Sequence, residues 1–220
     1  MPLFRFLVLT LGAARAKTGI QSLAATACAV LGMTLISTTP VSAASIGLNS
    51  PEAKAVIQTY FEENIAPWLS EPTLLGAIRD QNETTASLSE AEILELDKTW
   101  RDQVVTKDRP MVDQVIHSNI ANFFVHSVAG NGGIITEIFI MDAKGLNVAA
   151  SMPTSDYWQG DEAKFQQTFS VGVGAVHVGD IEFDPSTGVS QSQVSATITD
   201  PATGEPIGAI TVGVIADILM

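Results

Sequence analysis

Residues 137–169, EIFIMDAKGLNVAASMPTSDYWQGDEAKFQQTF, are the stretch that decides the fold. Glu137 to Met141 is apolar and rich in β-forming residues, and Leu146 to Ser151 returns as a second short strand. Between them Asp-Ala-Lys-Gly at 142–145 forms a turn, in which glycine adopts a positive φ at little cost. After residue 152 two aromatic residues and a helix start follow. We therefore predict a β-hairpin that leads into a helical segment lying over the sheet.

The order of these pieces resembles the extracytoplasmic Cache family, also called PDC sensor domains, whose members are PAS-like ligand binders. The matching runs are TEIFIMDAKGLNVAAS at 136–151, TSDYWQGDEAKFQQTF at 154–169 and GAITVGV at 208–214. The resemblance covers roughly the last half of the chain, and the preceding helical half agrees with it by pattern only. It implies a ligand pocket covered by a lid that runs from Pro153 to Phe169.

From Ala175 onward the sequence has a period of two, which indicates β-strands. The predicted strands are Val176 to Phe183 with a bulge at Gly179, Val189 to Thr199 after the turn Asp184-Pro-Ser-Thr-Gly188, and Ile207 to Ile215 after a second turn at 200–206. Together with the hairpin they make five strands, which run antiparallel wherever hairpin turns connect them.

Three amphipathic helical stretches precede the hairpin. Their start signals are Asn49-Ser50-Pro51-Glu52, a capping box at Ser89 to Glu92, and Pro110. The first stretch carries a continuous apolar stripe from Val56 to Trp68. Residues 71–87 are rich in polar and turn-forming residues, and we predict that they form a loop.

These patterns predict one α+β domain over residues 44–220. The expected architecture is a PAS-like five-stranded antiparallel sheet, with a long N-terminal helix packed along its back and a helical lid over its ligand side. By resemblance it is a single Cache-like sensor domain.

The first 43 residues have the pattern of a signal peptide. They contain three basic residues and no acidic one, then an apolar run from Leu23 to Ile36, then Pro40-Val-Ser-Ala43 with small residues before the expected cleavage site. The apolar run is shorter than the roughly 18 residues that span a bilayer comfortably. We expect export to the periplasm with cleavage after Ala43. The alternative is a membrane-anchored protein that keeps an uncleaved signal.

Charge and cysteine content exclude several classes of function. The chain has 24 acidic and 11 basic side chains, so its surface repels nucleic acid. Cys28 is the only cysteine, and it is lost with the signal peptide. The mature chain then has no disulfide, thiolate metal site or cysteine nucleophile.

The sequence offers no convincing catalytic or metal-binding group. His117, His126 and His177 are the only histidines. The first two share the third helical stretch nine residues apart, which places them on opposite faces. No G-x-S-x-G motif is present. We therefore predict a protein that is not an enzyme, with no catalytic residue, metal site or cofactor.

The predicted ligand site has a floor on the sheet and a roof in the lid. Phe139 and Met141 share one face of the first strand and form the floor. Gln193 and Ser195 share a parity on a later strand, so they face either water or a polar cavity. The roof consists of Tyr157, Trp158, Asp161 and Lys164.

The charged side chains near this site constrain the charge of the ligand. From Glu137 to the end there is no arginine, and Lys164 is the only cation placed to reach the pocket. An anionic ligand would depend on Lys164. An amine or a metal ligand would depend on Asp156 or Asp161 instead.

Two functions fit these observations. The first is an exported, sensor-type domain that captures a small metabolite in the periplasm, namely an organic acid, an amino acid or an amine, and can present it to a membrane receptor. The alternative is a protein-interaction module without a small-molecule site, which forms a homodimer or docks on a receptor through its N-terminal helix. Neither function involves nucleic acid.

Overall fold

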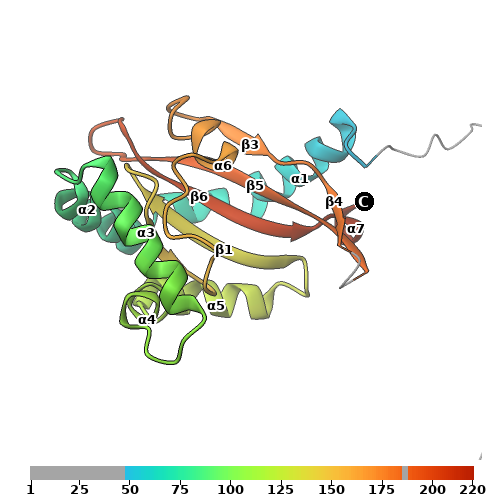
Figure 1. Cartoon of the computed structure of the whole chain (residues 1–220). Coiled ribbons are helices and arrows are strands. Elements are labelled where there is room, and N and C mark those ends of the chain that lie inside the picture. Colours follow the sequence, from blue (N-terminus) through green and yellow to red (C-terminus); the bar gives the residue numbers. More distant parts are fainter. Residues whose placement is uncertain (1–47, 185–187) are drawn as a thin grey trace, which may run out of the picture. The chain divides into compact units, whose positions relative to one another are not determined.

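The computed structural model describes residues 48–184 and 188–220 (Figure 1). The predicted signal peptide, residues 1–43, lies outside the described residues, as does the middle of the turn predicted at 184–188. Within the described ranges, no helix is both long and apolar enough to cross a membrane.

One antiparallel sheet forms the centre of the domain, with the strand order β2-β1-β6-β5-β3 and β4 paired to the first part of β5. The strands are β1 (Ile135–Asp142), β2 (Asn147–Ala150), β3 (Val176–Val178), β4 (Glu182–Asp184), β5 (Val189–Thr199) and β6 (Pro206–Ile215). The predicted α+β fold with an antiparallel sheet is confirmed. The sheet has six strands instead of five, because the chain leaves the ladder after Gly179 and divides the predicted strand 176–183 in two.

The register gives the sheet two faces of different composition. Ile140 and Ala196 both pair with Ile210, and all three side chains lie in the larger hydrophobic cluster on what we call the back face. Phe139 and Ser195 both pair with Thr211 on the opposite side, which we call the front face. Because directly paired residues point to the same side, each face is read from alternate positions.

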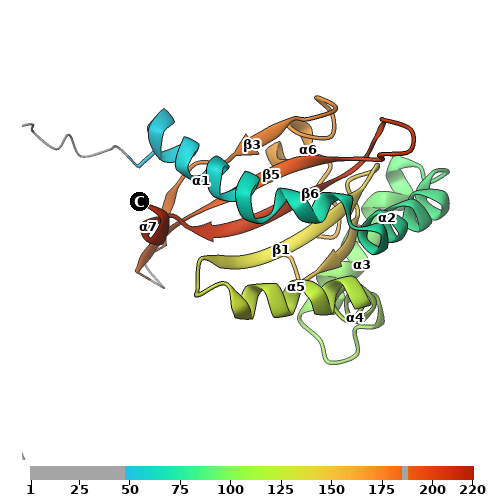
Figure 2. The same cartoon turned by 180° about the vertical axis from the view of Figure 1, so that it is seen from behind.

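Three helices cover the back face: α1 (Pro51–Asn64), α2 (Pro72–Thr85) and α5 (Asn119–Gly130) (Figure 2). The Ser50 hydroxyl caps α1 by accepting a hydrogen bond from the Ala53 amide. Ile57, Phe61 and Ile65 are all buried at the sheet, at the four-residue steps of one helix face. The long N-terminal helix packed along the back is therefore confirmed, and a short 3₁₀ helix, η1 (Ala66–Ser70), follows it.

The front face is covered by α3 (Glu90–Val104), α4 (Pro110–Ile116) and the lid, which is the segment 153–174 between β2 and β3 (Figure 1). Trp100, Phe139, Met141, Tyr157 and Phe165 belong to a second hydrophobic cluster on this side. Only α6 (Ala163–Gln166) is helical within the lid, and α7 (Ala216–Leu219) ends the chain. The lid is thus mainly a loop, although a helical segment was predicted.

The prediction of a loop at 71–87 is wrong, because this segment contains α2. Pro72 stands at its first turn, where a missing N–H costs nothing. Leu74, Leu75 and Ile78 are buried on one side, and the polar residues face outward. The helical stretch after Pro110 is also not continuous: α4 ends at Ile116, and Ser118 caps the separate helix α5.

Polar side chains of α2 join this helix to the sheet. The Asn82 amide donates to the Ile207 carbonyl at 2.7 Å, and its oxygen accepts from the Ala143 amide at 2.8 Å. The Arg79 guanidinium donates two bonds, at 2.7 and 2.6 Å, to the carboxylate of Asp200 in the β5–β6 turn. These contacts fix α2 at the hairpin end of the sheet.

Candidate functional site

A row of hydroxyl groups lies buried on the front face of the sheet. Ser195 and Thr211 are fully buried and share a hydrogen bond of 2.9 Å. Thr197, two residues along β5, is 5% exposed, and its hydroxyl has no hydrogen-bond partner among the described residues. Burying a hydroxyl without a hydrogen-bond partner costs free energy. Core packing alone therefore does not explain why hydroxyl side chains occupy these positions.

An open cleft of about 670 Å³ includes Gln193 and Gly213, the front-face positions next to Ser195 and Thr211 on β5 and β6. Glu137 and Gln193 both pair with Gly213, and the Gln193 amide donates to the Glu137 carboxylate at 2.8 Å. A Cβ added at Gly213 would lie 2.8 Å from the Glu137 Cγ. Glycine there makes room for the Glu137 side chain to lie across the sheet. Asp180 and Glu182 also line the cleft, which gives it an acidic wall.

Lys164 lies above the floor of the site. Its ammonium group is 5.5 Å from the centre of the Phe139 ring, a cation–π distance. It donates to the Gln159 side chain at 3.1 Å and pairs with Glu162 at 2.8 Å. The cation therefore already has an anionic partner within the lid, and an anionic ligand would have to compete with that carboxylate.

Tyr157 and Trp158 connect α3 to the hairpin. The Tyr157 ring stacks on Trp100 with centroids 5.4 Å apart. Trp158 forms an isolated β-bridge with Leu146, and its indole N–H donates to the Lys144 carbonyl at 2.9 Å. Burial raises the pKa of the Tyr157 phenol, with a smaller contribution from Asp142. Both aromatic rings are thus used for packing in this state.

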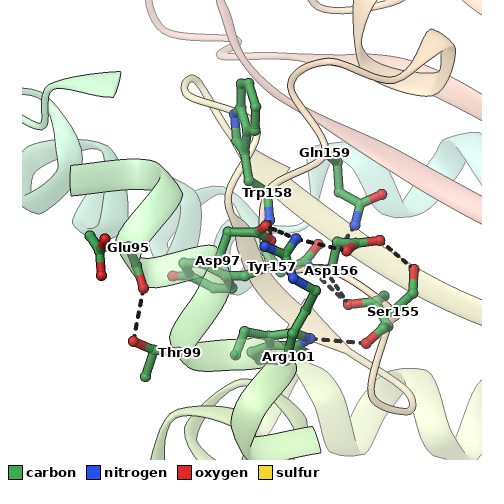
Figure 3. A network of polar contacts seen from close by, with 12 residues as sticks. Glu95, Asp97, Thr99, Arg101, Ser155, Asp156, Tyr157, Trp158 and Gln159 are labelled. Carbon is green, nitrogen blue, oxygen red and sulfur yellow. Dashed lines mark hydrogen bonds and ion pairs between the residues drawn. The ribbon is translucent and has the colours of Figure 1, made fainter. Parts of the chain in front are cut away.

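Asp97 of α3 holds this part of the lid, as Figure 3 shows. Its carboxylate, which is 4% exposed, accepts hydrogen bonds from the backbone N–H groups of Tyr157 and Trp158 at 2.9 and 3.1 Å. Arg101 pairs with Asp97 one helical turn away and also with Asp156 in the lid. The sequence-based prediction missed Asp97, because an acidic residue on a helix usually faces solvent.

His177 continues the row of front-face residues onto the edge strand, where it pairs with Ser195. Burial lowers its pKa, the nearby Lys54 lowers it further, and Asp180 opposes both. The imidazole is therefore neutral at neutral pH. In the part of the chain that the structure describes, no group of three His, Cys, Asp or Glu side chains is arranged to hold a metal ion.

The structure distributes the eight predicted site residues over four places. Ser195 belongs to the hydroxyl row, Lys164 lies over the Phe139 ring, and Gln193 lines the cleft. Met141, Tyr157 and Trp158 pack toward α3 and the hairpin, and Asp161 is exposed to solvent. Thr211, Thr197 and Glu137 were missed, although their alternation with apolar neighbours was visible in the sequence.

Comparison with known proteins gives a fold-level likeness only. No protein-family model and no curated protein matches the chain. Among solved structures, it is similar to the ligand-binding domain of the Campylobacter jejuni chemoreceptor Tlp3 in complex with 4-methylisoleucine, with 11% identity and a TM-score of 0.38 over 76% of this chain and 56% of that one. The same domain in complex with L-valine gives 13% identity and a TM-score of 0.36 over 77% and 66%.

The sensor domain of the V. cholerae histidine kinase DctB is also similar, with 12% identity and a TM-score of 0.31 over 76% of this chain and 54% of that one. The chain thus spans between 54% and 66% of the length of these three solved domains. These neighbours are described as the ligand-binding domain of a chemoreceptor and the sensor domain of a histidine kinase.

Proposed function

We propose that this domain binds a small molecule on the front face of its sheet and acts as a sensor-type ligand-binding domain. The observation that carries the proposal is the buried hydroxyl row of Ser195, Thr197 and Thr211 beside a cleft of about 670 Å³. Binding pockets of this size commonly combine an apolar wall with a few placed polar groups. Phe183, which lines the cleft, supplies an apolar side chain there.

The charges around the site narrow the ligand to an organic acid, an amino acid or an amine. Lys164 can reach an anionic group from the lid, and Glu137 can accept a hydrogen bond from an ammonium group in the cleft. Because the two side chains carry opposite charges, they separate the classes of ligand. An acid depends on Lys164, an amine depends on Glu137, and an amino acid depends on both.

Thermal-shift screening of the purified protein against small carboxylates, amino acids and amines tests this proposal, because a ligand that binds only the folded state raises the melting temperature. Any compound found is then titrated against Lys164→Ala and Glu137→Gln, with Trp158→Ala as a variant outside the hydroxyl row. Loss of a charge-assisted hydrogen bond weakens binding by about 1.5–3 kcal/mol. If no compound shifts the melting temperature, the sensor role loses its support.

We further propose that residues 1–43 are a cleaved signal peptide and that the domain 44–220 works in the periplasm, where it can deliver its ligand to a membrane receptor. The sequence pattern supports this proposal. Mass spectrometry of the exported protein should find an N-terminus at or near Ala44. A membrane-bound form that keeps residues 23–36 would favour the anchored alternative.

The rival function, a dimerisation or docking module, is favoured by one observation on α1. Val56 is 37% exposed, and it lines a hollow together with Tyr60 and Leu219. Sedimentation of the wild type and of Val56→Asp over a range of concentrations tests this function. Ile57 is unsuitable for that test, because it is fully buried at the sheet and its substitution by aspartate would unfold the domain.

A further inference from the structure

The lid consists of two parts that are attached to the domain in different ways. The first part, residues 154–160, is bonded on both sides. On the α3 side, Asp97 accepts two backbone N–H bonds, and the Trp100 indole donates to the Thr154 carbonyl at 2.9 Å. On the hairpin side, the backbone N–H of Asn147 donates to the Tyr157 carbonyl at 3.0 Å. We call residues 154–160 the clamped segment.

The second part, residues 161–174, has no such attachment. Within the described ranges, every hydrogen bond and ion pair of this segment has its partner between residues 159 and 175. Phe165 packs in the front-face cluster, Phe169 stacks on it at 5.0 Å, and Lys164 lies over Phe139. Side-chain packing is therefore what holds this segment against the sheet.

The C-terminal end of this segment is suited to a backbone rotation. Near its end, Gly172 and Gly174 have φ values of 116° and 77°, where side chains other than glycine are strained, and nothing lies within 4 Å of a Cβ added at either position. The neighbouring Val171 and Val173 are 66% and 63% exposed, so this end makes little contact with the core.

The segment α6 packs on β5, which carries Ser195 and Thr197 of the hydroxyl row. We propose that residues 161–174 are a gate that opens locally, while the clamped segment stays in place, and that this movement controls access to Ser195, Thr197 and Thr211. This inference rests on the proposed ligand-binding role of the front face. Regions with few attachments open with less free energy than the global unfolding of the domain.

A buried cysteine measures gate opening without any ligand. In a Cys28→Ser background, Ser195→Cys places a thiol beneath the gate, and Ala196→Cys places one on the back face at the neighbouring position. Both are treated with a small thiol reagent in the native state. We expect the thiol at position 195 to react at least about tenfold faster, because it needs only local opening.

Adding Phe165→Ala removes the main apolar contact of the gate. It should accelerate labelling of the thiol at position 195 by about tenfold or more. At position 196, the labelling rate divided by the rate of global unfolding should stay unchanged. Global unfolding rates are measured on the same variants in urea. Equal labelling at 195 and 196, or a rate at 195 that Phe165→Ala does not alter, would overturn the gate. Because no ligand is used, failure of the gate and failure of ligand binding are separate outcomes.

Discussion

The two faces of the sheet are built from the same strands but carry different side chains. The back face presents Ile140, Val194 and Ile210, which α1, α2 and α5 cover. The front face presents Phe139, Ser195 and Thr211 at the next positions of the same three strands. Both sets are buried. The back face follows the requirement for a dry core, whereas the front face keeps polar groups under a cover that has few attachments. We expect the back face to dominate stability, and our proposal places ligand binding on the front face.

The largest effect is expected on the back face. Phe61→Ala removes a buried ring between α1 and the sheet, and such truncations lower the free energy of unfolding by about 3–5 kcal/mol. Phe165→Ala truncates the same residue type on the front-face gate and should cost less, because the gate can collapse or open. Urea unfolding measures both. Equal losses would contradict the division between the faces.

A smaller effect is expected at the clamp. Asp97→Ala leaves the buried N–H of Tyr157 and the partly buried N–H of Trp158 without their acceptor, and the expected loss of stability is about 1–3 kcal/mol in total. Hydrogen exchange should rise in residues 154–160 of this variant. Asp102→Ala, on the exposed side of the same helix, is the matched control and should change neither quantity. If protection from hydrogen exchange at 154–160 did not change, Asp97 would not be the residue that holds this segment.

Substitutions in the hydroxyl pair on the front face should have non-additive effects on the free energy of unfolding. Ser195→Ala or Thr211→Val alone leaves one hydroxyl unpaired and should cost about 1 kcal/mol. The double variant should cost less than the sum, because both polar groups are then gone. The stability of the four proteins gives the coupling. Additive losses would mean that the two hydroxyls do not depend on one another.

The smallest effect concerns pH. The hydrogen bonds from Arg79, and then the one from the Ala202 amide, hold the pKa of Asp200 below its usual value. Its carboxylate therefore contributes stability above the unfolded pKa of about 3.9, and this contribution is lost as the pH falls through the lower folded pKa. In Asp200→Asn, the free energy of unfolding measured with urea should fall less steeply than in the wild type as the pH is lowered. Asp161→Asn, at an exposed carboxylate of the lid, is the control. Parallel curves for wild type and Asp200→Asn would refute this assignment.

The alternation along the strands was readable from the sequence. Phe139 and Met141 share a face, and so do Gln193 and Ser195, as predicted, because side-chain direction in a strand depends only on parity. Helix α2 was missed for a compositional reason. Its polar residues on the outward side concealed the buried positions Leu74, Leu75 and Ile78, although proline at its first turn was a start signal.

The clamp could not be predicted from local pattern. Asp97 accepts hydrogen bonds from residues 60 and 61 positions away, and those donors are backbone groups that every sequence has. The same holds for Trp158, whose indole finds the Lys144 carbonyl only once the hairpin has formed. Such contacts depend on tertiary placement, so the sequence can indicate a lid but not how the lid is fastened. The roles of the predicted site residues in ligand binding remain predictions.

The position of Asn82 affects how the protein can be produced. Asn82-Glu-Thr84 matches the acceptor motif for N-linked glycans, and the nitrogen that would carry a glycan is the atom that donates to the Ile207 carbonyl. A glycan attached before folding would stand between α2 and the last strand. Secretion from a eukaryotic host should therefore yield misfolded, glycosylated chains, whereas a bacterial host, which lacks this modification, should yield the native domain.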